Sequence, residues 1–244
     1  MHGTFNTHHI FSLICIPFFE GLRVESYGTG TQVRYVTRGN IMVPPTITSP
    51  TTHDRSTVSF SLCNLIHTGS SPFRSSLSIV RRLPGRTAME PRIFKFGTPY
   101  ADMYTSLAAT AEDAAYFTRN GVLQLCRRGA AVKTAPARWQ DSPDELISLH
   151  DVVIAFEERV FDAVIEDLQI RQPTQDFRPI HVVCLDTKDN PHEAALQGQV
   201  CLELCWRLEQ AEDLQVEAAE IIDQFQQERA AYTPIKVLYQ LCFL

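Results

Sequence analysis

The stretch IHVVCLDTKDNPHEA, residues 180–194, indicates the fold more clearly than any other part of the chain. It opens with six mostly apolar residues rich in β-branched side chains, which is typical of a buried parallel strand. Two carboxylates, Asp186 and Asp189, follow, and Asn190 and Pro191 then mark the start of a helix. In open α/β sheets, catalytic and ligand-binding groups lie at the carboxyl ends of such strands. We therefore predict a functional loop at these two carboxylates.

This loop allows two interpretations. In the first, Asp189 donates a proton to a leaving group, and Asp186 is the neighbour whose like charge favours the protonated donor. In the second, both carboxylates only cap the helix that follows and complement its dipole. The spacing of the two residues does not choose between these interpretations.

The rest of the chain repeats the order of strand and helix. Val152–Phe156 is a continuous apolar run, typical of a buried strand, and Glu157–Arg171 places its apolar residues on one helical face. A further helix is predicted from Pro99 through about Thr118, and one long helical region over about 191–229. This alternation predicts the α/β class, with a doubly wound parallel sheet and right-handed crossovers.

Composition limits the kind of protein. The 244 residues, 44% of them hydrophobic, are enough for one ordinary core. The 22 basic and 28 acidic residues give a net charge of −6, which argues against direct nucleic-acid binding. The apolar run Ile10–Phe19 is too short to span a bilayer and lacks the flanks of a signal peptide, so no membrane association is predicted.

The seven cysteines are scattered among apolar positions, so no disulfide framework is predicted. No CxxC pair is present and the histidines lack the spacing of a zinc site, so neither a metal nor a cofactor is predicted. We expect five of the cysteines to be buried thiols: Cys126, Cys184, Cys201, Cys205 and Cys242.

A phosphatase partner for Asp189 would be a cysteine in a C-x5-R loop. Its thiolate attacks phosphorus, while backbone amides and the arginine hold the phosphate oxygens. The sequence contains one literal match, CLELCWR at Cys201–Arg207. Its internal residues, Leu, Glu, Leu, Cys and Trp, are typical of an apolar helix and place an acid where the phosphate would lie. No glycine or serine is there to turn amides inward, so we reject this match. No nucleophile is assigned in this chain.

Residues 35–81 differ from the rest of the chain. Of these 47 residues, 16 are Ser or Thr and one, Asp54, is acidic, and no helical or strand period persists. We predict a disordered, low-complexity insertion, although an unstructured insertion of this length is unusual inside a compact domain.

Eight segments, in the same order, resemble the phosphatase family that dephosphorylates the C-terminal heptad repeats of the largest RNA polymerase II subunit. This family has a low-molecular-weight tyrosine-phosphatase-like fold and is specific for the phosphoserine at the fifth heptad position. The resemblance covers about 24–34 and 82–244. The segments are VESYGTGTQVR (24–34), RLPG (82–85), FGTPYADMY (96–104), NGVLQL (120–125), KTAPARWQDS (133–142), FEERVFDAVIEDL (156–168), HVVCLDTKDN (181–190) and LELCWRLE (202–209).

The resemblance implies roles for individual residues. Asp189 matches the family's general acid, and Asp186 matches the carboxylate that supports it. The groove that grips the heptad peptide takes a cis proline after the phosphoserine, an isomer that is sparse in free peptides. The family reaction runs through a phosphocysteine and implies no metal or cofactor. The groove positions are Leu83 and Pro84, with either Arg82 or Arg34.

The resemblance also implies a location and partners. It indicates a nuclear protein-serine phosphatase, a hydrolase that works in transcription and mRNA 3′-end processing. The implied partners are the phosphorylated C-terminal domain of RNA polymerase II and symplekin or its counterpart in the cleavage-and-polyadenylation machinery.

Two departures from the family pattern bear on activity. Residues 1–21 lack the family's first strand and its C-x5-R-S phosphate loop, and 35–81 interrupts the phosphatase-like domain predicted over 22–244. We therefore expect a sheet without its first, central strand, and an inactive polypeptide. The insertion is interpreted as translated intron and the N-terminus as a misplaced start. The alternative function is a non-catalytic adaptor that keeps only the surface for the 3′-end processing scaffold.

Overall fold

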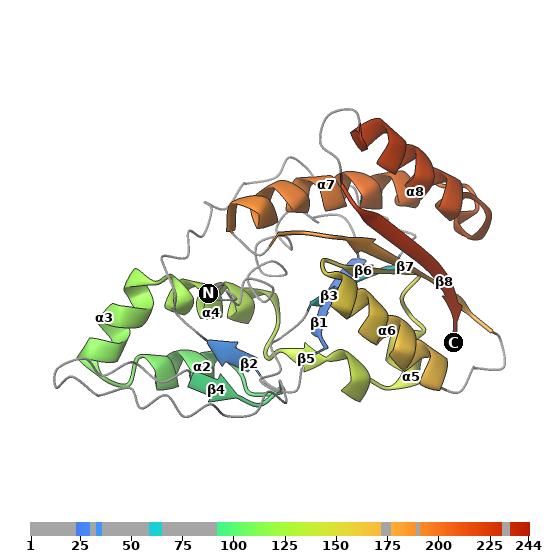
Figure 1. Ribbon diagram of the computed structural model, residues 1–244. Helices are drawn as coiled ribbons and strands as arrows, with labels where there is room; N and C mark the ends of the chain where they lie inside the picture. Colours follow the sequence, from blue (N-terminus) through green and yellow to red (C-terminus); the bar gives the residue numbers. More distant parts are fainter. Residues whose placement is uncertain are drawn as a thin grey trace, which may run out of the picture.

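The computed structural model describes residues 23–29, 33–35, 59–64, 92–171, 177–188, 191–230 and 235–244 (Figure 1). Within these residues a main sheet carries helices on both faces, and a smaller group of helices lies beside it with a two-stranded sheet. None of the described helices is apolar and long enough to cross a membrane.

The main sheet has six strands in the order β5-β1-β3-β6-β7-β8. Neighbouring strands run parallel, except that β8 runs antiparallel to β7. The predicted α/β class with a parallel sheet is confirmed. The strands are β1 (Arg23–Gly28), β3 (Ser59–Asn64), β5 (Ala137–Arg138), β6 (Val152–Ala155), β7 (Pro179–Leu185) and β8 (Val237–Phe243).

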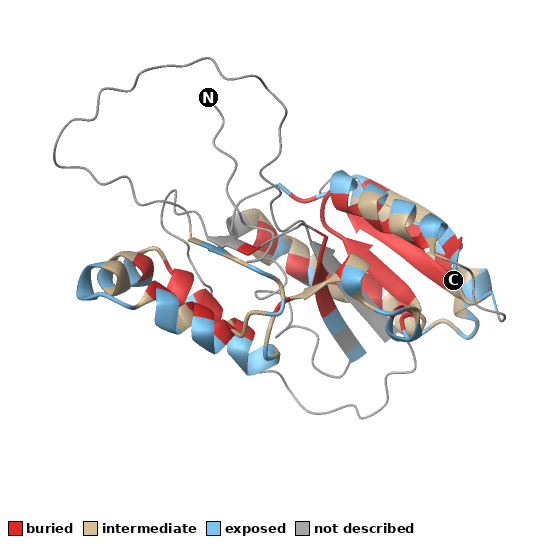
Figure 2. Cartoon of the chain, turned by 90° about the horizontal axis from the view of Figure 1, so that it is seen from below, coloured by how far each residue is buried: buried red, intermediate tan, exposed pale blue. Residues whose placement is uncertain are grey.

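Alternation along the strands divides the core into two layers. The side chains of Val152 and Ile154 join the cluster beneath α7 (Pro191–Glu209) and α8 (Leu214–Ala230). Those of Val153 and Ala155 join the cluster beneath α6 (Glu158–Ile170) on the other face. Successive strand side chains point to opposite faces, so one apolar run fills both layers. Figure 2 shows the buried residues on the strands and on the inner faces of the helices.

The smaller group has its own core. It contains α2 (Tyr100–Leu107), α3 (Ala111–Arg119) and α4 (Val122–Val132), with the antiparallel pair β2 (Val33–Tyr35) and β4 (Arg92–Phe94). Tyr100 packs so closely on α4 that a Cβ built at Gly129 would meet its ring at 2.8 Å. A short helix α5 (Asp144–Ile147) and a 3₁₀ turn (Trp139–Asp141) connect this group to β6.

The strand β3 corrects two of the predictions. It comes from the segment 35–81, which was predicted to lack regular structure, and it fills the central place that the sheet was expected to lack. It pairs with β1 over Arg23↔Ser59 to Gly28↔Asn64, and with β6 over Phe60↔Val152 to Cys63↔Ala155. A gap between β1 and β6 would leave two rows of backbone N–H and C=O groups unpaired. The run SFSLCN supplies a short polar and apolar alternation that suits this place.

Residues 1–22, 36–58 and 65–91 lie outside the described residues. The boundaries proposed there, and the interpretation of these segments as gene-model artefacts, stay predictions.

Candidate carboxyl-edge site

The parallel strands end at one edge of the main sheet, where the sequence predicted the site. Gly28 at the end of β1 pairs with Asn64 at the end of β3. One register step away, Ala155 at the end of β6 pairs with both Cys63 of β3 and Cys184 of β7. Asp186 follows β7 directly, so its carboxylate belongs to this edge.

Backbone contacts hold the loop after β7 in place. The amide of Thr187 donates a 3.1 Å hydrogen bond to the Phe156 carbonyl, and the amide of Asp186 donates a 3.2 Å bond to the Lys236 carbonyl. The Thr187 hydroxyl donates to the Leu185 carbonyl at 2.7 Å. Thr187 is buried while Asp186 is exposed. The loop is therefore fixed between β6 and β8, with the Asp186 carboxylate free to meet a solute.

Charges at this edge act on two neighbours of Asp186. Burial, with the nearby carboxylates Asp186 and Glu158, raises the pKa of the Cys184 thiol to about 12. The hydrogen bond from Lys236 Nζ to Glu158, 2.6 Å long, raises the pKa of that exposed lysine, and Asp186 adds to the shift. Cys184 is therefore a neutral thiol near pH 7, whereas the thiolate is the reactive form of a cysteine.

The turn after β1 is also tied down. Gln140 Nε2 donates a 3.3 Å hydrogen bond to the carbonyl of Thr29, which is buried. Lys133 Nζ donates to the Ser26 carbonyl and lies 5.8 Å from the centre of the Tyr27 ring. The end of β1 is thus held by side chains from the segments on either side of β5.

The structure brings only part of the predicted site together. Asp186 lies at the carboxyl edge, as expected. The backbone of Arg34 pairs with Ile93 in the two-stranded sheet, outside the main sheet. The roles assigned to these residues stay predictions. The other candidates, Asp189, Arg82, Leu83 and Pro84, lie outside the described residues.

The cysteine predictions are confirmed. Cys126, Cys184, Cys201, Cys205 and Cys242 are free, buried thiols. The rejection of the C-x5-R match is also supported, because Cys201 packs in the core beneath α7. Arg207 points elsewhere, pairing with Glu203 and Glu228 at 2.8 Å each. The two ends of the match do not form a phosphate cradle.

Sequence reasoning missed two residues at this edge. Thr187 fixes the loop, and a threonine after a strand gives no distinctive signal. Cys63, the last residue but one of β3, pairs with Tyr27 and Ala155, and Gly69 rather than arginine stands six positions after it. The alternation in SFSLCN was the one signal for this strand. Among the described residues, no three His, Cys, Asp or Glu side chains are grouped to hold a metal ion.

Comparisons with known proteins agree on one family. A model of the family described as Ssu72-like protein matches residues 76–244. The RNA polymerase II C-terminal domain phosphatase ssu72 of Schizosaccharomyces pombe is 37% identical over 163 residues, covering 66% of this chain and 78% of that protein. The Homo sapiens counterpart is 35% identical over 162 residues, with the same two shares, 66% and 78%.

Solved structures give the same result. A Drosophila melanogaster Ssu72 structure holds symplekin and a cis peptidomimetic of the C-terminal domain phosphorylated at the fifth-position serine. It matches with a TM-score of 0.57 and 28% identity, over 64% of this chain and 76% of that one. A further Ssu72 structure covers 98% of this chain and 94% of its own, with a TM-score of 0.66 and 23% identity, which bears on the fold alone.

Proposed function

Because this chain belongs to the Ssu72-like protein family, we propose that its function is that of a protein-serine phosphatase for the heptad repeats of the RNA polymerase II C-terminal domain. We further propose that these 244 residues contain the general acid of the site but lack the C-x5-R-S loop that carries the nucleophile, and that this polypeptide is inactive. The observation that carries the proposal is the loop after β7, which is fixed at the carboxyl edge with Asp186 exposed.

The proposed reaction needs three parts. A thiolate forms a bond to phosphorus while the bond from phosphorus to the serine oxygen breaks, an acid protonates that oxygen, and water then hydrolyses the phosphocysteine. We assign the acid to Asp189 and its support to Asp186. The cradle and the thiolate are the missing parts. Each supplies orders of magnitude in rate, so the acid alone is not expected to give turnover.

The cysteines of the described residues support the proposal that the nucleophile is missing. Burial raises the pKa of both Cys184 and Cys242, so neither is a thiolate near pH 7. Cys63 has the most favourable place in the backbone, one residue before the end of the central strand. The sequence after it holds no arginine in register to bind a phosphate. A cysteine without that arginine lacks the charge that stabilises the transferred phosphoryl group.

The proposal also covers the groove that binds the substrate peptide, the partners of the protein and its location in the cell. Leu83 and Pro84, with Arg82 or Arg34, would grip the heptad peptide. The Drosophila relative is bound to symplekin and to a mimic of the phosphorylated peptide, which supports a symplekin-like scaffold and the phosphorylated heptad as partners here. A nuclear location follows from work on RNA polymerase II.

A phosphate-release assay with a heptad peptide phosphorylated at the fifth-position serine tests the reaction. The 244-residue protein should release no phosphate above the buffer background, while the S. pombe relative in the same assay should turn over. Clear turnover by this chain that Asp189→Asn abolishes would show that a nucleophile is present and that the inactivity is wrong.

The second candidate function is a non-catalytic adaptor, and the structure favours it over a polypeptide that cannot fold. With β3 in place, the main sheet is continuous from β5 to β8, so a partner surface can persist without the reaction. A pull-down with a symplekin-like scaffold separates the two candidates. An adaptor should retain the scaffold with no turnover, and loss of both would leave neither function to this chain.

A further inference from the structure

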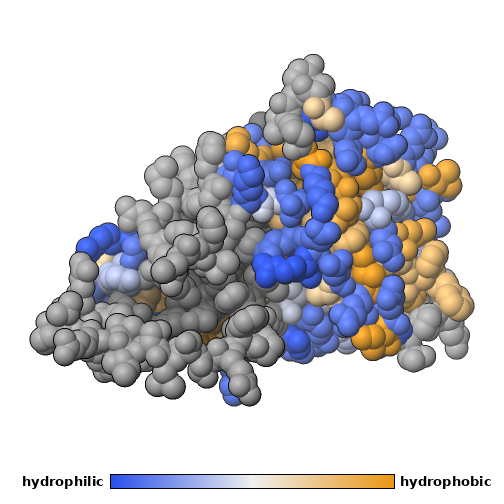
Figure 3. Space-filling model, viewed as in Figure 1, coloured by the Kyte–Doolittle hydropathy of each residue, from blue (hydrophilic) through white to orange (hydrophobic). Residues whose placement is uncertain are grey.

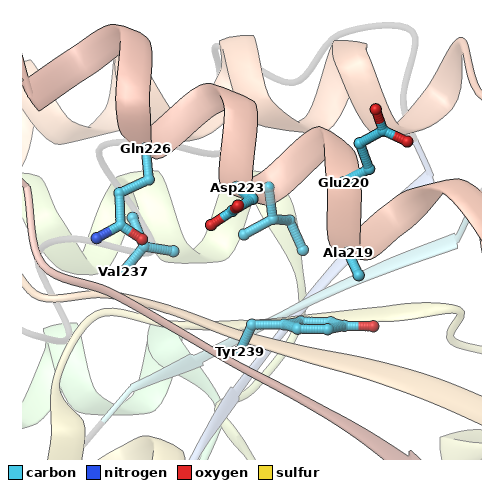
Figure 4. Close-up of a pocket in the computed structure, with 7 residues that line it drawn as sticks. Ala219, Glu220, Asp223, Gln226, Val237 and Tyr239 are labelled. Carbon is cyan, nitrogen blue, oxygen red and sulfur yellow. The ribbon is translucent and has the colours of Figure 1, made fainter.

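Two hollows beneath α8 are unrelated to the proposed reaction. The first, of about 340 Å³, lies at the amino ends of β6 and β7, the edge opposite Asp186, and its lining includes Asp151, His181, Glu212 and Asp213. The second, of about 490 Å³, lies between α8 and β8, and its lining includes Glu220, Asp223, Gln226 and Tyr239 (Figure 4). Both are large enough for a long side chain.

An aromatic pair joins the two hollows. The rings of His181 and Tyr239 stack with centroids 6.0 Å apart and an interplanar angle of 12°. Tyr239 Oη and His181 Nδ1 are 2.9 Å apart, so that ring nitrogen is already occupied. Each ring lines a different hollow, so the pair forms a shared floor beneath α8.

His181, which lines the first hollow, has hydrogen-bonding capacity left. Its neighbours in β7, Ile180 and Val182, pack in the layer beneath α6, so His181 faces the α8 layer. The residue is 1% exposed, and its Nε2 has no hydrogen-bond partner within the described part of the chain. A buried polar atom without a partner is costly unless a ligand supplies one.

The charge around the hollows is negative. The side-chain amides of Gln224 and Gln227 donate to the carboxylates of Glu220 and Asp223 at 3.0 and 3.2 Å, and an amide brings no positive charge to either acid. Among the described residues no cation forms an ion pair with either of them. Arg178 also lines the first hollow and pairs with Asp151 at 3.0 Å, so the acids there that no cation of the described residues pairs with are Glu212 and Asp213.

The carboxyl-terminal half of α8 differs, because its charged residues form ion pairs with α7. Glu228 pairs with Arg207 of α7 at 2.8 Å, and Arg229 pairs with Glu203. The carboxyl-terminal half of α8 is thus neutralised against α7, whereas the amino-terminal half presents its acids to the hollows. Figure 3 shows hydrophilic residues over α8 at the upper right of the view.

Figure 4 shows Asp223 and Gln226 extending from α8 toward β8, with Val237 near Gln226 and the Tyr239 ring below Asp223 and Ala219. A carboxylate above an aromatic face is the arrangement that holds an ammonium or guanidinium group, through charge and through cation–π attraction. We propose that this groove binds a basic peptide segment of a partner protein, with a lysine or arginine side chain over Tyr239 and a second one in the hollow of His181. Charge complementarity and two side-chain-sized hollows along one helix favour a peptide over a single small cation.

The test is a titration of the full 244-residue protein with a fluorescent acetyl-Arg-Gly-Lys-Arg-amide peptide, followed by polarisation at low salt. The double variant Glu220→Gln with Asp223→Asn should weaken binding about five-fold or more. Tyr239→Leu should weaken it by a similar factor, while Tyr239→Phe keeps the ring face and should retain most of the affinity. The double variant Asp162→Asn with Glu166→Gln removes two exposed acids of α6 at the opposite face, so it is the matched control and should bind as the parent does.

Four results would overturn the proposal, and three of them come from the peptide titration: no binding at millimolar concentration, equal affinity in the Glu220 and Asp223 double variant and the parent, or an equal loss in the α6 control variant. The third result would mean that net charge alone attracts the peptide. A free arginine amide that binds as tightly as the peptide would show a small-cation site instead. Circular dichroism of each variant excludes loss of fold as the cause of any weakening.

Discussion

The amide of Thr187 donates a hydrogen bond to the carbonyl of Phe156, and this bond joins the loop after β7 to the end of β6. The Thr187 hydroxyl adds a second contact, to the Leu185 carbonyl. Both contacts involve a buried residue, so water does not readily replace them. The position of the Asp186 carboxylate is therefore set by backbone contacts rather than by its own side chain.

The substitution Thr187→Val tests this relationship. Valine has nearly the same shape but no hydroxyl, so the Leu185 carbonyl loses a hydrogen bond at a buried position. We expect the free energy of unfolding in urea to fall by about 1–2 kcal/mol. Thr187→Ser keeps the hydroxyl and should lose less. Equal losses in the two variants would mean that the methyl group, not the hydrogen bond, is the stabilising part.

Arg171 should be a strong contributor to stability. Its side chain is 10% exposed and donates to Asp167 at 2.6 Å and to Asp144 at 2.5 Å, which joins α6 to α5. Removal of one partner of a buried ion pair leaves uncompensated charge. We expect Arg171→Met to lower the free energy of unfolding by about 3 kcal/mol.

The exposed pair between Arg138 and Asp141 is the control for Arg171. The Asp141 side chain is 63% exposed, and Arg138→Met should cost less than about 1 kcal/mol. Urea unfolding of both variants measures the difference. A loss at Arg171 no greater than that at Arg138 would contradict the importance of the buried network.

Deletion of residues 36–81 should abolish cooperative folding. The deletion removes β3, and β1 and β6 then lose their pairing partner at the centre of the sheet. Two unpaired ladders would cost more than the net stability of a typical domain, which is roughly 5–15 kcal/mol. Deletion of residues 40–52 alone keeps the β3 sequence and serves as the control. A cooperative melt after the longer deletion would show that β3 is dispensable, as the intron interpretation requires.

Stability should fall as the pH drops below neutrality. Burial lowers the pKa of His150 and of His181 below the ordinary value of 6.5. The unfolded chain then binds these protons at a higher pH than the native protein does. The stabilisation is complete above about pH 6.5 and is lost as the pH falls through the lowered pKa, by up to about 1.4 kcal/mol per pH unit for each histidine.

Urea unfolding at several pH values between 5.5 and 7.5 measures this slope (both limits are roughly one unit from the unperturbed histidine pKa). The variants His150→Gln and His181→Gln should each reduce the slope, because glutamine does not titrate. A slope that is the same in the parent and in both variants would assign the effect to other groups.

Long, continuous patterns were predictable from the sequence. The apolar run at Val152–Phe156 forms β6, which is Val152–Ala155, and its side chains fill both core layers. The pair Asn120–Gly121 predicts a helix end, and Gly121 takes a φ of 75° between α3 and α4. Asp186 was predicted at the end of a strand and lies there, because composition alone identifies a strand buried on both faces.

Local capping was harder to predict. The helix expected from Pro99 to about Thr118 is divided, because the Thr110 side chain accepts a hydrogen bond from the Asp113 amide and starts α3. The long helical region over 191–229 is divided at Asp213, whose side chain accepts from the Gln215 amide at 3.0 Å. In both cases a polar side chain competes with a continuous apolar stripe, and the stripe shows the clearer pattern in the sequence.

The central strand could not be predicted from average composition. Six residues with a weak alternation, Ser59–Asn64, lie within a segment dominated by serine and threonine. Their strand conformation depends on β1 and β6, which are distant in sequence and offer unpaired edges. Tertiary context of this kind overrides local propensity. The place of Cys63 at the carboxyl edge follows from that pairing and was missed with it.

In mechanical terms, β3 is the strand that holds the two halves of the main sheet together. Among the described strands, β5 and β1 on one side connect to β6, β7 and β8 on the other through hydrogen bonds to Ser59–Asn64. A fluctuation that peels away these six residues frees both halves at once, so amide hydrogens in β1 and β6 should exchange with deuterium at matched rates. The least regular stretch of the sequence thus decides whether the sheet moves as one body or as two.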